Sequence, residues 1–106
     1  MGNVHPLFFQ RWYHSREENA AGAIVYRPSS FPFPPTRFRE AIEFGPGGSV
    51  TYFGLGSDDR RVPISGRWER IGQAVVRTEF ADARAPSSEW RLTEAAGPYP
   101  RLDIVA

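Results

Sequence analysis

The chain has no cysteine and no lysine among its 106 residues. The absence of cysteine excludes disulfides, thiolate catalysis and thiolate metal sites. His5 and His14 are the only histidines, and their separation is not that of a helical or hairpin zinc site, so we expect no metal and no cofactor. No apolar run approaches the length that spans a bilayer, and the first residues do not resemble a secretory signal. We therefore expect a cytoplasmic protein without a membrane partner.

Charge is nearly balanced along the sequence. All thirteen basic residues are arginine, and twelve acidic residues leave a formal net charge of +1. The arginines are interleaved with glutamates rather than gathered in one stretch, whereas a nucleic-acid-binding protein needs a cationic face that neutralises phosphates. The balance therefore predicts no nucleic-acid partner. With 41% hydrophobic and 24% charged residues, the composition is that of one globular domain spanning residues 1–106.

Windows long enough for a helix are few, because ten glycines and ten prolines interrupt the chain. Between these breakers lie short runs rich in aromatic and β-branched residues, which are typical of strands. The runs predict about eight strands, in residues 7–17, 23–27, 37–44, 49–55, 62–64 with 66–71, 74–80, 89–94 and 101–106. Short connections between such strands favour an all-β fold, an antiparallel up-and-down meander closed into a small barrel with little helix.

Three features give the sequence a family resemblance: Trp12 early on the first strand, the run Gly66-Arg67-Trp68, and Arg101 near the last strand. With its strand-turn rhythm, the chain resembles the lipocalin-like, or calycin, group of small barrels. Residues 12–18, 25–28 and 44–68 are also similar to small, uncharacterised bacterial lipocalin-like proteins. In that group an early Gly-x-Trp and a late arginine often pack together at the closed end. Here residue 10 is Gln in place of the glycine, and the Gly-x-Trp lies mid-chain.

A proline-rich stretch separates the second and third predicted strands. Four prolines in residues 28–36 forbid both a helix interior and regular strand pairing, so we expect an extended loop. Phe31 and Phe33 alternate with the prolines, and exposure of their two phenyl rings to water would be energetically unfavourable. Either the loop folds back over the mouth of its own barrel, or it docks a partner.

Glu40 and His14 are the candidate catalytic residues. Strict alternation places Glu40 on the same face as Phe38 and Ile42, the face we assign to the barrel interior. A carboxylate there is either an acid-base group or one half of a structural ion pair. His14 shares a face with Trp12, so its imidazole stands near the barrel mouth, as a proton shuttle or as a hydrogen-bonded wall residue.

The sequence is compatible with three functions. The first is a barrel that binds a small apolar or aromatic molecule through eight aromatic side chains: Trp12, Tyr26, Phe31, Phe33, Phe38, Tyr52, Trp68 and Trp90. The second is an isomerase or cyclase that uses Glu40 as its acid-base group. The third is an interaction module with a filled barrel, whose simplest form is a homodimer.

Overall fold

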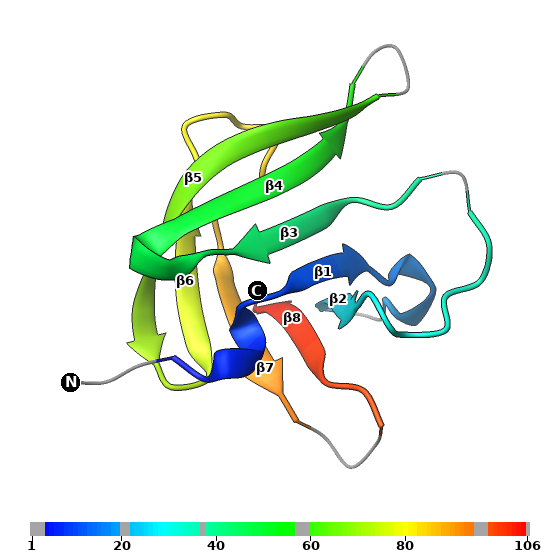
Figure 1. Ribbon diagram of the computed structural model, residues 1–106, viewed down its shortest axis with the longest axis horizontal. Coiled ribbons are helices and arrows are strands. Elements are labelled where there is room, and N and C mark those ends of the chain that lie inside the picture. Colours follow the sequence, from blue (N-terminus) through cyan, green and yellow to red (C-terminus); the bar gives the residue numbers. More distant parts are fainter. Residues whose placement is uncertain (1–3, 20–21, 37, 57–59, 95–97, 106) are drawn as a thin grey trace.

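The computed structural model describes residues 4–19, 22–36, 38–56, 60–94 and 98–105. Within these residues the chain forms eight strands and three short 3₁₀ turns (Figure 1): η1 (Pro6–Phe8), β1 (Arg11–His14), η2 (Arg16–Glu18), β2 (Ala23–Pro28), β3 (Ala41–Phe44), η3 (Pro46–Gly48), β4 (Ser49–Leu55), β5 (Arg61–Gly72), β6 (Val75–Glu79), β7 (Glu89–Thr93) and β8 (Arg101–Val105). No helix in the described part is long and apolar enough to cross a membrane.

The eight strands close into one barrel in which all neighbours are antiparallel. From β3 to β8 they form a meander, each hydrogen bonded to the next. The β1–β2 hairpin completes the ring in reversed order, because β1 pairs with β3 and β2 pairs with β8. The predicted all-β antiparallel barrel is confirmed, and the connection from β2 to β3 crosses over β1.

This connection, residues 29–40, is called the crossover segment below. Figure 1 shows that the crossover segment passes around the outside of the barrel, beyond β1. Phe33 packs edge-on against the outward-facing Tyr13 with ring centroids 6.2 Å apart, and Phe31 packs against Tyr99 at 5.3 Å. The loop therefore folds back onto its own domain, but it packs on the outer wall of the barrel and not over the mouth. Because the chain must pass β1 to reach β3, the segment is held against the outer wall.

Inward-facing side chains fill most of the barrel. Trp12 lies opposite Pro28 on one neighbouring strand and Ile42 on the other, and Ile42 in turn lies opposite Tyr52. Trp12, Ile42 and Trp90 are all 0% exposed. Burying a large apolar side chain stabilises a fold by roughly 1.5–3 kcal/mol. The interior around these residues is thus a packed core rather than a hollow.

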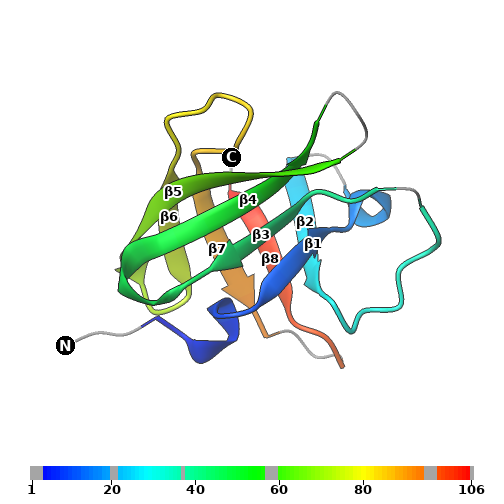
Figure 2. The same ribbon diagram turned by 45° about the horizontal axis from the view of Figure 1, so that its top comes forward.

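The N-terminal segment closes one end of the barrel, opposite the β6–β7 loop and the end of β8 (Figure 2). Phe8 of η1 is fully buried and meets Phe44 edge-on at 5.6 Å. The indole Nε1 of Trp12 donates to the Phe8 carbonyl oxygen at 3.3 Å, which satisfies its buried N–H. This turn seals the core from water at that end.

Arg101 does not join Trp12 at the closed end. On β8 its inward-facing neighbour is Leu102, which is fully buried, so Arg101 faces outward and its Nε donates to Asp103 Oδ1 at 2.6 Å. The paired tryptophan and late arginine of the lipocalin-like group are therefore not reproduced here. The molecule is consistent with a lipocalin-like barrel at the level of eight antiparallel strands in a closed ring.

Gly66 allows β5 and β6 to approach closely. A Cβ atom at this position would lie 2.6 Å from the Glu79 carbonyl oxygen and would also collide with the Phe80 ring. We expect Gly66→Ala to lower the free energy of unfolding by about 1–3 kcal/mol, as overpacking does. Urea denaturation measures this change. Gly72→Ala on the same strand is the control, because a Cβ there meets no atom within 4 Å; equal effects of the two variants would contradict the close-approach argument.

Candidate functional site

The open end of the barrel holds a cavity of about 350 Å³, called the barrel mouth below. Its lining comes from β1, β2, β4 and β8, from Glu40 just before β3, and from the β6–β7 loop. Ten residues line it: His14, Ile24, Tyr26, Glu40, Tyr52, Ala83, Arg84, Ala85, Pro86 and Ile104. An imidazole, a carboxylate and two phenols therefore meet at a single opening with apolar walls.

Strand register brings these polar side chains together. His14 lies opposite Tyr26 in the β1–β2 pair, and its backbone N–H donates to the Glu40 carbonyl oxygen at 2.8 Å. One step deeper, Ile42 lies opposite Tyr52. Since alternate residues of a strand share a face, His14, Glu40 and both tyrosines point inward above the packed core.

Asn19 sets the orientation of His14. The Asn19 Oδ1 atom accepts from the Val25 backbone N–H at 3.0 Å, so its Nδ2 group is the one that lies 3.1 Å from His14 Nε2. An amide Nδ2 can only donate, which assigns the lone pair to Nε2 and the proton to Nδ1. Nδ1 lies 3.5 Å from Glu40 Oε1. Asn19, His14 and Glu40 thus form a directed chain of polar contacts.

Glu40 sits at the rim of the mouth, with its side chain 35% exposed. Its Oε1 atom faces His14 and also lies 3.6 Å from an Arg16 guanidinium nitrogen. No described residue makes a hydrogen bond to its Oε2 atom. One carboxylate oxygen is thus contacted by the protein, and Glu40 is also one of the residues that line the mouth.

The two phenols of the mouth have perturbed acidities. Burial raises the pKa of Tyr26 well above its usual value, and it also raises the pKa of Tyr52; the charge of Glu40 adds to both shifts. Both phenols therefore stay protonated at neutral pH, and each hydroxyl is a potential hydrogen-bond donor at the mouth.

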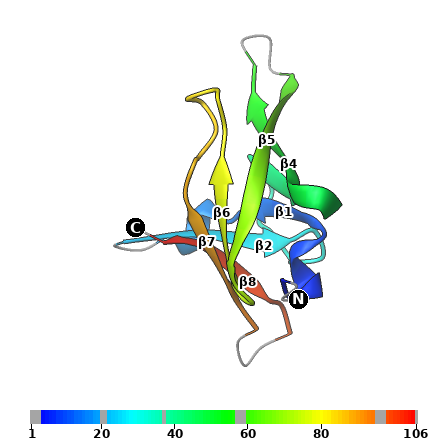
Figure 3. The ribbon, with the colours of Figure 1, turned by 90° about the vertical axis from the view of Figure 1, so that its left-hand side faces the viewer.

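The β6–β7 loop forms the roof of the mouth and is tied to the core. Thr78 Oγ1 donates to the Pro86 carbonyl oxygen at 2.9 Å and accepts from Trp90 Nε1 at 3.0 Å. Figure 3 shows this loop rising beside the β4–β5 hairpin. Sequence reasoning missed Ala83–Pro86 as a lining segment, since four small or polar residues between two strands carry no pattern beyond that of a loop.

Of the eight aromatic residues proposed to bind a ligand, Tyr26 and Tyr52 line the mouth. Trp12 and Trp90 are fully buried in the core. Trp68 lies beside the closed end, where it meets Phe9 edge-on at 6.0 Å. The remaining three lie in or beside the crossover segment, outside the barrel: Phe31, Phe33 and Phe38. A ligand role for these eight residues stays a prediction.

Phe38 departs from the expected register. Alternation predicts it on the inner face with Glu40, but β3 begins only at Ala41, and the Arg61 guanidinium lies 4.8 Å from the Phe38 ring centroid in an exterior groove. That groove of about 410 Å³ lies between the crossover segment and β1, and an apolar hollow of about 540 Å³ lies beside the closed end. Neither gathers inward-pointing polar groups as the mouth does.

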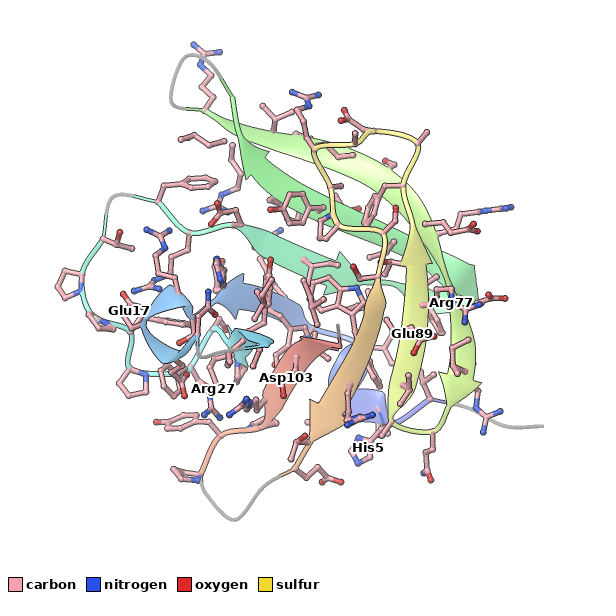
Figure 4. The ribbon with its side chains drawn as sticks, turned by 180° about the vertical axis from the view of Figure 1, so that it is seen from behind. His5, Glu17, Arg27, Arg77, Glu89 and Asp103 are labelled. Atoms are coloured by element: carbon pink, nitrogen blue, oxygen red, sulfur yellow. The ribbon has the colours of Figure 1, made fainter. Side chains whose placement is uncertain are left out.

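Two ion pairs fasten η2, the turn that precedes Asn19. Glu18 receives two hydrogen bonds from Arg27 of β2, at 2.8 and 2.6 Å. Glu17 receives two from Arg39 of the crossover segment, at 2.8 and 2.7 Å, and this pairing lowers the pKa of Glu17 to about 2. In Figure 4, Glu17 and Arg27 lie at the left of the barrel, and the Arg77–Glu89 pair lies at the right.

Among the described residues, no group of three or more histidine, aspartate or glutamate side chains is placed to hold a metal ion. In comparisons with known proteins, no family model matched the chain, and neither the curated proteins nor the solved structures gave a match. The candidate site therefore stands on its own geometry.

The buried Tyr26 phenol gives a pH prediction. Its folded-state pKa is raised above the value of about 10 in an unfolded chain, so its contribution to stability is complete below pH 10 and is lost as pH rises through the folded pKa. We expect Tyr26→Phe to have a flatter decline of unfolding free energy above pH 10 than the wild type. Urea denaturation between pH 8 and about 11.5 measures both slopes; parallel declines would mean that Tyr26 is not buried as described.

Proposed function

We propose that the protein binds one small organic molecule at the barrel mouth. The observation that carries this proposal is the convergence of Glu40, Tyr26, Tyr52 and His14 on one open cavity with apolar walls. Ligand sites commonly combine apolar walls with a few polar groups that fix orientation. A volume of about 350 Å³ lies at the low end of the usual range, which favours a molecule of one or two fused rings.

The free groups of the mouth define what such a molecule must offer. Glu40 Oε2 accepts a hydrogen bond, and the Tyr52 O–H donates one. A complementary ligand carries a donor and an acceptor a few ångströms apart on a flat apolar frame. The Tyr26 and His14 rings stack on each other with their centroids 5.1 Å apart, which holds both rings in place at the border of the mouth.

The packed core favours the mouth, rather than the centre of the barrel, as the ligand site. Trp12 and Trp90 occupy the space that a deep cavity would need. A central ligand would have to displace side chains that each stabilise the fold by kilocalories per mole. The mouth needs no such displacement.

The proposal predicts binding of a two-ring phenol such as 2-naphthol, followed by backbone NMR shifts. We expect the largest shifts near His14, Tyr52 and Ala85. Ala83→Phe places a ring in the mouth and should weaken binding about tenfold or more, equivalent to ~1.4 kcal/mol. Ala81→Phe is the matched control, an exposed alanine in the same loop that does not line the mouth.

Two outcomes would contradict this site. One is the absence of saturable binding by the wild-type protein. The other is a set of shifts confined to the hollow beside the closed end, around Phe9 and Trp68. In the second case, Ala83→Phe would bind the probe as well as the wild type does.

A further inference from the structure

We propose that the barrel mouth also transfers protons: Glu40 removes a proton from a carbon next to a carbonyl group, while Tyr52 holds the carbonyl oxygen. The substrate class is a small, flat carbonyl compound with an acidic C–H bond. This inference rests on the binding site proposed above, and it assigns that site a reaction.

Glu40 is placed to act as the base. Its Oε1 atom is oriented by His14 and Arg16, and its Oε2 atom has no hydrogen-bond partner among the described residues. His14 is itself fixed by Asn19. His14 and Asn19 are therefore positioning residues, and the free carboxylate oxygen meets the substrate.

Tyr52 is placed to stabilise the oxygen on which charge develops. Tyr52 lines the mouth beside Glu40 and is 8% exposed, so its hydroxyl is a donor that is largely shielded from water. A donor in such a place stabilises a developing oxyanion more strongly than one in bulk water does.

The step is balanced without any further reactant. The C–H bond breaks, its proton goes to Glu40 Oε2, and its electron pair forms a C=C bond as the carbonyl becomes an enolate. Tyr52 donates a hydrogen bond to the enolate oxygen. Glu40 then returns the proton, either to the same carbon or to another carbon of a conjugated substrate. The first route exchanges the hydrogen, and the second isomerises a double bond.

Apolar walls suit a neutral carbonyl substrate. Ile24, Ala85 and Ile104 border the mouth beside the polar groups. They exclude part of the water that would compete for Glu40 and the phenol. The proposed proton transfer requires neither a lysine nor a metal ion, because the only new charge forms on the carbonyl oxygen beside Tyr52.

The test uses 2-tetralone, a two-ring ketone whose enol has nearly the shape of 2-naphthol. Exchange of its C1 hydrogens in D2O is followed by proton NMR. We expect the wild-type protein to accelerate exchange above the buffer rate. Glu40→Gln should lose about 10²-fold or more of that acceleration, and Tyr52→Phe a similar amount. Glu43→Gln is the matched control, because Glu43 is an outward-facing, exposed glutamate on β3, three residues after Glu40, and pairs with Arg11.

Binding of 2-naphthol distinguishes the absence of proton transfer from the absence of ligand binding at the mouth. If wild type and Glu40→Gln both bind 2-naphthol but exchange 2-tetralone at the buffer rate, the proton-transfer role is overturned and the binding role stands. If Glu40→Gln retains wild-type exchange, Glu40 is not the base. If 2-naphthol does not bind to the wild type, both proposals fail.

Discussion

The two bidentate ion pairs of η2 fix the point where the chain crosses its own first strand. Glu18 ties the turn to Arg27 on β2, and Glu17 ties it to Arg39 in the crossover segment. Arg39 is only 6% exposed and also donates to the His14 and Pro34 carbonyl oxygens. A buried guanidinium without its carboxylate would be strongly destabilising. The β1–β2 hairpin thus enters the ring in reversed order with its turn fastened on both sides.

That crossing has a consequence for the mouth. The turn held by the two ion pairs leads directly to Asn19, which orients His14, which in turn faces Glu40. The same contacts that close the barrel therefore organise its polar opening. At the other end, η1 and the buried tryptophans Trp12 and Trp90 fill the inside of the barrel. Structural closure and a packed interior together leave His14, Glu40, Tyr26 and Tyr52 gathered at one rim.

Periodicity predicted much of this arrangement. The alternation through Ile42 and Phe44 placed Glu40 on the inner side, and β4 matches residues 49–55 as expected. β5 runs without a break from Arg61 to Gly72, whereas the sequence predicted an interruption at residue 65. Pro63 is tolerated because β5 pairs only with β4 there, and β6 joins from Arg67 onward. The crossing of β1 has no local signal, because alternation does not say which strands become neighbours.

The most direct test of the organised mouth is the tautomer of His14 in solution. Long-range ¹H–¹⁵N NMR at a pH where the imidazole is neutral reports which ring nitrogen carries the proton, and His5→Gln assigns the signals. The chain of contacts from Asn19 predicts a proton on Nδ1 and a lone pair on Nε2. A proton on Nε2 would contradict it, because Asn19 could then not donate to His14 and Glu40 would lose its oriented partner.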